Sequence, residues 1–181
     1  SLNVQNTFDL QYNSGSTEIL IGSSGNLVAN EITKTNSTYT KSTGKDSSGN
    51  DLATGYSITN NGTIQVGTSL NLPASFKIKN NGIIKDKGSA TGATYTFAGT
   101  YDNSSTGTLI VDGGSITNTA AEITINNLTL KNSNTINGTQ KIKVTNATYT
   151  DSTNLTIIGT VELPGVTNGN VTIGNVNTES T

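Results

Sequence analysis

The chain of 181 residues has no cysteine, histidine, methionine, tryptophan or arginine, and all ten of its cationic residues are lysine. Without cysteine there can be neither disulfide bonds nor thiolate zinc sites. Because histidine is also missing, the commonest general base, metal ligand and nucleophile are all lacking, and we expect a protein that is not an enzyme and holds no cofactor or metal. Only 12% of the residues are charged and the net charge is −2, which argues against a nucleic-acid surface. No run of about 18 apolar residues is present, so no membrane span is expected.

What the chain does contain is asparagine (25), threonine (33) and serine (19), which together supply 77 of the 181 residues. Disordered chains combine low hydrophobicity with high net charge and few β-branched residues, whereas this chain is rich in threonine, isoleucine and valine. Neutral amide and hydroxyl side chains in place of lysine and glutamate suggest an extracellular surface. We therefore predict a folded extracellular protein.

Short segments with alternating apolar residues recur along the whole chain, and no segment shows a convincing helical period. They cover residues 17–22, 26–33, 55–59, 63–72, 75–79, 82–87, 95–101, 108–114, 122–130, 141–150, 155–163 and 170–176. Asn61-Gly62 and Asn81-Gly82 are typical hairpin turns, and the apolar phase slips between Ile125 and Leu128, which predicts a bulge. The pattern predicts an all-β fold, an Ig-like or pilin-like antiparallel β-sandwich. The alternative is a parallel β-solenoid, although no fixed period of 20–30 residues is visible.

The first twelve residues form the longest alternating segment. Its apolar side chains are Leu2, Val4, Phe8, Leu10 and Tyr12. Eleven residues are long for one strand, and the sequence "NSGS" that follows resembles a tether more than a tight turn. We predict that residues 1–14 are a donor strand and tether and that residues 15–181 are a single sandwich domain; an ordinary first strand of the chain's own fold is the alternative. A donor strand would enter the next copy by β-strand addition, and such a head-to-tail contact propagates as a filament.

The alternating N-terminal extension, the cysteine-free β domain and the low-charge surface rich in Asn, Thr and Ser resemble subunits of donor-strand-linked pili, most closely archaeal thread filaments. The resemblance implies a glycosylated extracellular filament on the cell surface, built from copies of one chain and serving adhesion and biofilm formation. The other hypothesis is a glycan- or protein-binding adhesin domain, sandwich or solenoid, of a bacterial surface protein.

N-linked glycans are expected partners because eight Asn-x-Ser/Thr sequons occur, about as many as the composition gives by chance. They are Asn36, Asn61, Asn103, Asn127, Asn137, Asn146, Asn154 and Asn170. The acidic turns at Asp46, Asp51 and Asp102 lack the alternating oxygen ligands and distal glutamate of an EF-hand, so we interpret them as ordinary turns and predict no metal site. A Lys–Asn or Lys–Asp isopeptide cross-link stays open, since nothing in the sequence identifies such a pair.

Overall fold

The computed structural model describes residues 1–9, 19–33, 58–72, 74, 77–88, 92–150, 154–164 and 172–174, and these contain fifteen β-strands and no helix. The strands are β1 (Leu2–Asp9), β2 (Ile19–Ile21), β3 (Asn26–Thr33), β4 (Ile58–Asn60), β5 (Thr63–Leu72), β6 (Lys77–Asn80), β7 (Ile83–Asp86), β8 (Thr94–Phe97), β9 (Thr100–Asn103), β10 (Thr108–Asp112), β11 (Ser115–Asn118), β12 (Ile123–Lys131), β13 (Ser133–Tyr149), β14 (Asn154–Glu162) and β15 (Thr172–Gly174). Leu10, Tyr12, Asn36, Asn170 and the acidic turn at residues 46–51 lie outside the described residues.

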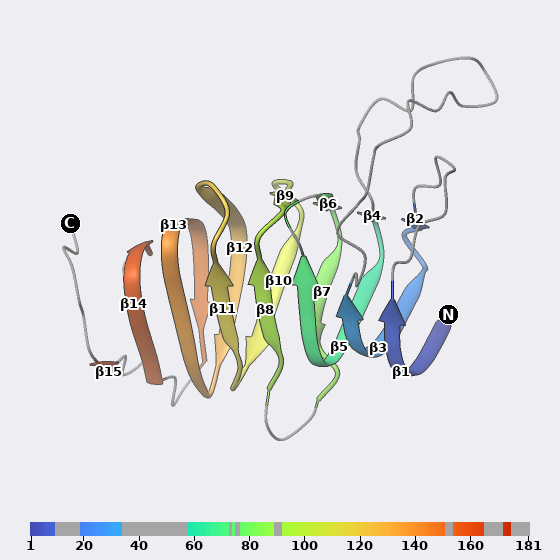
Figure 1. Ribbon diagram of the computed structural model, residues 1–181, viewed down its shortest axis with the longest axis horizontal. Helices are drawn as coiled ribbons and strands as arrows, with labels where there is room; N and C mark the ends of the chain where they lie inside the picture. The colour runs from blue at the N-terminus through green and yellow to red at the C-terminus, as the bar shows by residue number, and fades with distance from the viewer. Residues whose placement is uncertain are drawn as a thin grey trace, which may run out of the picture.

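All strand pairs in the described part of the chain are parallel, and the strands coil into a parallel β-solenoid of about six turns. Figure 1 shows the turns side by side along the long axis, with β1 near one end and β14 near the other. The predicted antiparallel sandwich is therefore wrong, and the solenoid alternative holds. Parallel neighbours need a long connection, and here each connection is the rest of a solenoid turn.

Three stacks of strands form the sides of the solenoid, and the chain passes through them in the same order in each turn. Face 1 is the stack defined by the inward residues Leu27, Ile64, Ile84, Leu109, Leu128 and Ala147. Face 2 is the stack defined by Ile32, Leu70, Tyr95, Ile116, Ile136 and Ile157. Face 3 contains β2, β4, β6 and β9 and continues into the first residues of β12. The longer strands β3, β5 and β13 bend around corners and so belong to more than one face.

The sequence shows no fixed period because the number of residues in each solenoid turn varies. On face 1 the spacing between equivalent residues ranges from 19 (Leu128 to Ala147) to 37 (Leu27 to Ile64), and the longest interval contains residues 34–57. A solenoid tolerates such differences because extra residues leave at a corner while the stacked strands keep their register.

The Asn-Gly pairs occupy corners of the solenoid, so the predicted hairpins are wrong. β4 pairs with β2 and β6, while β5 pairs with β3, β7 and β8, so the two strands flanking Asn61-Gly62 do not pair with each other. Backbone hydrogen bonds continue through the corner: Thr63 N–H donates to Gly25 O at 3.0 Å, and Ile83 N–H donates to Gly62 O at 2.8 Å. The predicted bulge in residues 122–130 is likewise a corner, where β12 passes from face 3 to face 1.

The inward side chains form one continuous core of isoleucine, leucine and valine with a few aromatic rings. Tyr95 and Phe97 are fully buried, and the ring of Phe97 stacks on that of Tyr101 with centroids 4.6 Å apart. Each turn therefore buries its apolar residues against the turns on either side, which is how a solenoid is stabilised.

The N-terminal strand belongs to this same solenoid. β1 pairs in parallel with β3 of its own chain, Val4 and Phe8 pack against the core, and Thr7 Oγ1 donates a hydrogen bond to Glu31 at 2.9 Å. Leu2 is 53% exposed at the end of the molecule. The predicted donor strand is therefore wrong, because alternation establishes that one side of a strand is buried but not which molecule buries it.

Candidate functional site

A ladder of buried asparagines supports the corner between faces 3 and 1. Asn60 Nδ2 donates to Asn80 Oδ1 at 2.8 Å, and Asn80 Nδ2 donates to the Tyr101 hydroxyl at 3.3 Å. Asn103 Nδ2 also donates to Tyr101, and Asn103 Oδ1 accepts from Asn126 N–H at 2.7 Å. The amides bind one another and the turning backbone, so this ladder is structural and offers no group to a ligand.

Among the described residues, Asp86 is the one buried carboxylate, and it lies on face 1 beside Tyr95. Its Oδ1 accepts hydrogen bonds from Ala93 N–H at 2.7 Å and from the Tyr95 hydroxyl at 3.2 Å, and its Oδ2 accepts from Asp112 N–H at 2.5 Å. Burial raises the pKa of Asp86 above its ordinary value, while the backbone donors partly oppose the rise. Burial also raises the pKa of Tyr95. The carboxylate satisfies the backbone of a turn and opens onto none of the pockets described below.

The charged side chains of the described residues lie mainly on faces 1 and 3. On face 1 they include Lys85, Asp112 and Lys131. On face 3 they include Lys77, Lys79, Asp102, Glu122, Lys141, Lys143 and Glu162. Lys141 Nζ lies 2.6 Å from Glu162 and 3.6 Å from Glu122. The hydrogen bond with Glu162 raises the pKa of Lys141, and the same bond lowers the pKa of Glu162. Pairs of opposite sign make this face a self-neutralised surface.

Between Glu31 and Ile158, face 2 is different, because its outward side chains there are hydroxyls and amides. They lie in two rows on β5, β8, β11, β13 and β14, and we call this surface the hydroxyl face. The first row is Ser69, Thr94, Ser115, Thr135 and Thr156, and the second row is Asn71, Thr96, Thr117 and Asn137. None of these nine residues is charged, and Ser115 Oγ donates to Thr94 Oγ1 at 3.3 Å.

The hydroxyl face is flat and regular because sheet geometry spaces it. Neighbouring strands lie about 4.8 Å apart and alternate residues about 6.6 Å apart, so the two rows form a grid. The side chains between the rows point inward and are buried, as Leu70, Tyr95, Ile116 and Ile136 are. At one end of the grid the first row is bordered by Glu31, which pairs with Ser69. At the other end the second row is bordered by Ile158, which pairs with Asn137 and is 42% exposed.

A depression runs along one edge of the hydroxyl face, where the chain turns from face 2 to face 3. It has a volume of about 280 Å³, and much of its wall is small: Ala74, Ala98, Gly99, Ala120 and Ala121 contribute to it. Tyr101, Glu122 and Ile123 lie on the face 3 side. The small side chains leave the edge of the grid accessible.

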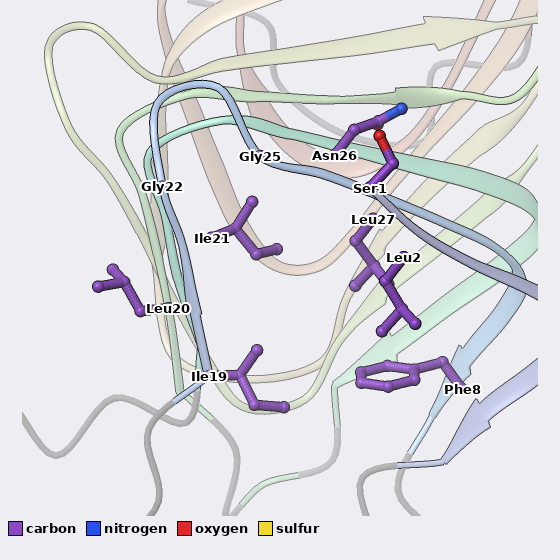
Figure 2. A pocket seen from close by; sticks show the side chains of 10 residues that line it. All are labelled: Ser1, Leu2, Phe8, Ile19, Leu20, Ile21, Gly22, Gly25, Asn26 and Leu27. Atoms are coloured by element: carbon purple, nitrogen blue, oxygen red, sulfur yellow. The ribbon is translucent and has the colours of Figure 1, made fainter.

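A second pocket, of about 220 Å³, lies at the end of the core next to β1 (Figure 2). Figure 2 shows the Phe8 ring below Leu2 and Leu27, with Leu20 directed away from them. Leu20 is 65% exposed, and the pocket is lined mainly by apolar side chains. It is the end of the apolar core itself, since no face 3 strand precedes β2 in the described residues.

The predicted glycosylation sites differ widely in accessibility. Asn61, Asn146 and Asn154 are exposed, whereas Asn127 and Asn137 are half-buried. Asn103 is only 5% exposed and its amide belongs to the corner ladder. Asn137 lies on the hydroxyl face, and Asn61 lies at an outer corner where its Oδ1 accepts from Asn81 Nδ2 at 2.8 Å.

Within the described residues no group of three or more His, Cys, Asp or Glu is placed to hold a metal ion. No described helix is long and apolar enough to cross a membrane. Comparison of the chain with protein-family models, curated proteins and solved structures finds no match.

The sequence pattern does not predict the hydroxyl face. Its signal consists of triplets such as Thr94-Tyr95-Thr96 and Ser115-Ile116-Thr117, which recur at unequal intervals in a chain where threonine and serine are everywhere. Only the register of the strands shows that these triplets lie side by side.

Proposed function

We propose that this protein is a non-enzymatic binding module of an extracellular, adhesin-like surface protein, and that it binds through the hydroxyl face. The observation that carries the proposal is the separation of side-chain types: charged side chains lie mainly on faces 1 and 3, while nine neutral hydroxyl and amide residues form a grid on face 2. A module of this kind needs no catalytic group.

The rigidity of the scaffold supports this proposal. Each strand beneath the grid is hydrogen-bonded in parallel to a strand on either side. The inward side chains of these strands, such as Tyr95, Ile116 and Ile136, are buried in the core. A surface whose side chains are already placed loses less conformational entropy on binding than a flexible loop. A flat grid also presents many weak contacts to one extended partner, and such contacts add up.

Donor-strand polymerisation is not part of the proposal, because β1 is already paired with β3 of its own chain. The extracellular location and N-linked glycosylation remain proposals that follow from the neutral polar surface and the exposed sequons such as Asn61.

The test compares two matched double variants. Thr96→Lys with Thr117→Lys places two charges on neighbouring strands of the hydroxyl face, and Thr129→Lys with Thr148→Lys does the same on face 1. Beads carrying each protein are passed over surfaces coated with cell-wall polysaccharide, collagen or phosphatidylcholine vesicles. We expect at least one surface to retain the wild type and the face 1 variant but not the face 2 variant. Equal loss in both variants, or retention of no protein on any surface, would contradict the proposal.

A further inference from the structure

We propose that the hydroxyl face binds an unbranched neutral polysaccharide that lies along the solenoid axis, with about one sugar on each strand. This inference rests on the proposed function and specifies its ligand.

The spacing of the grid supports the direction of the chain. Strands in a sheet repeat every ~4.7–4.9 Å, which is close to the length of one sugar unit in an extended β-1,4-linked chain, so the two repeats stay nearly in step over a few units. The five strands of the hydroxyl face, β5, β8, β11, β13 and β14, are consecutive neighbours in this stack. A stretch of about five sugars would span them.

The chemistry of the grid favours a neutral ligand. Each serine and threonine hydroxyl both donates and accepts hydrogen bonds, and each asparagine amide does so through separate atoms, as sugar hydroxyls require. An acidic glycan would need lysine or arginine opposite its carboxylates or sulfates. None of the nine residues of the hydroxyl face carries a charge, and the charged residues of the described chain lie mainly on faces 1 and 3.

The depression beside the grid gives room for a sugar ring. Its alanine and glycine wall is made of small side chains, so the carbon–hydrogen face of a sugar can pack there, with Tyr101 and Glu122 on the opposite side. The outward positions of the hydroxyl face contain no aromatic residue on which a sugar could stack. Each sugar is then held weakly, and affinity must come from several sugars bound together.

The experiment is a titration with soluble β-1,4-linked gluco- and manno-oligosaccharides of two to six sugars, followed by calorimetry or by amide chemical shifts. We expect affinity to rise by at least about tenfold from two sugars to five and then to level off, because a sixth sugar passes the last strand. We also expect less than about a twofold change in affinity between low and high salt, because no ion pair forms.

Two isosteric variants test the role of the hydroxyl groups. Thr96→Val with Thr117→Val keeps the shape of the side chains and removes the hydroxyls, and should lower affinity about tenfold. Thr96→Ser with Thr117→Ser retains the hydroxyls and should stay within about threefold of the wild type, as should Thr129→Val with Thr148→Val on face 1. Circular dichroism of every variant confirms that the strands are intact.

The inference is overturned if no neutral oligosaccharide binds, if two sugars bind as tightly as five, or if the face 1 variant loses as much affinity as the face 2 variant. If beads still attach to a protein or lipid surface through Thr96 and Thr117 while no oligosaccharide binds, the ligand assignment fails and the proposed function stands. If attachment also fails on every surface, both fail.

Discussion

At the scale of single residues, the structure depends on a few polar groups buried beside the apolar core. Asp86 is one of them, since its two carboxylate oxygens accept three hydrogen bonds from the backbone and from Tyr95. A carboxylate has acceptors on both oxygens, whereas the amide nitrogen of asparagine would face a backbone N–H.

Asp86→Asn should therefore destabilise the protein by about 1–3 kcal/mol, the cost of an unsatisfied buried donor. Urea unfolding measures the effect. Glu122→Gln is the control, because its ion pair with Lys141 is exposed and such pairs contribute at most about 1 kcal/mol. Equal effects from the two variants would mean that the Asp86 hydrogen bonds do not matter.

The raised pKa of Asp86 also predicts a pH dependence. Between the unfolded value of 3.8 and the higher folded pKa, the native state binds more protons than the unfolded state, so the free energy of unfolding falls as pH rises. The difference in stability between wild type and Asp86→Asn should then be larger at pH 4 than at pH 7, as urea titrations at the two pH values would show. A smaller difference at pH 4 would mean that the folded pKa is lowered.

We expect glycan occupancy to differ between two of the sequons, Asn61 and Asn103. Asn61 is exposed at a corner, whereas Asn103 is 5% exposed and is hydrogen-bonded to Tyr101 and Asn126. In a host that attaches N-linked glycans, folded protein should carry a glycan at Asn61 and none at Asn103, because a glycan at Asn103 would break the corner ladder. Mass spectrometry of glycopeptides checks this, and occupancy of Asn103 in folded material would contradict it.

At the scale of elements, the corners decide whether the strands can stack. Gly62, Gly82 and the corner glycine of the next turn, Gly107, lie where successive turns approach closely. A Cβ on Gly82 would lie 2.2 Å from Gly62 O, which is too close for any real contact.

Gly82→Ala should therefore displace the corner and destabilise the fold by more than about 1 kcal/mol, as substitutions that force the backbone apart do. Gly22→Ala is a matched control, because a Cβ there meets nothing within 4 Å. Thermal unfolding of the two variants should give a clearly lower melting temperature only for Gly82→Ala.

At the scale of the whole molecule, the solenoid is held together by contacts between neighbouring turns. Within the described residues each inner turn is covered on both sides, whereas the turn that contains β1 pairs on one side only and borders the pocket around Leu2 and Phe8. Stability in such a repeat is roughly a sum of nearest-neighbour terms, so the ends open more easily than the middle.

Hydrogen exchange should therefore be slowest in the central strands β7, β8, β10 and β11 and faster in β1. Mass spectrometry of peptides after timed exchange provides the measurement. Uniform protection from β1 to β11 would indicate that a further partner covers the end of the core.

Much of the local structure follows from the sequence. The segments 26–33 and 63–72 are strands as predicted, and each of the other predicted segments overlaps a strand, with boundaries that differ in most cases. β11 was missed because it is only four residues long and lies close after β10. The predicted hairpins failed because Asn-Gly favours a tight turn in any context, and such a turn serves a solenoid corner as well as a hairpin.

The candidate site could not be predicted in the way that the strands could, because it depends on tertiary structure. Thr96 and Thr117 lie on adjacent strands, but twenty-one positions separate them in a chain whose repeat changes length from turn to turn. Buried residues leave a periodic signal because apolar and polar positions alternate, whereas a surface row of threonine among so many other threonines leaves none.

From the sequence alone it follows that the protein is built of β-strands with apolar inner sides and a polar exterior that carries little charge, because alternation and composition act within a few residues. The tertiary structure added three things: the strands run parallel, the first of them pairs within its own chain, and hydroxyl groups from five strands form one surface. Those outcomes depend on the register between segments some twenty residues or more apart, and local preferences carry no information about that register.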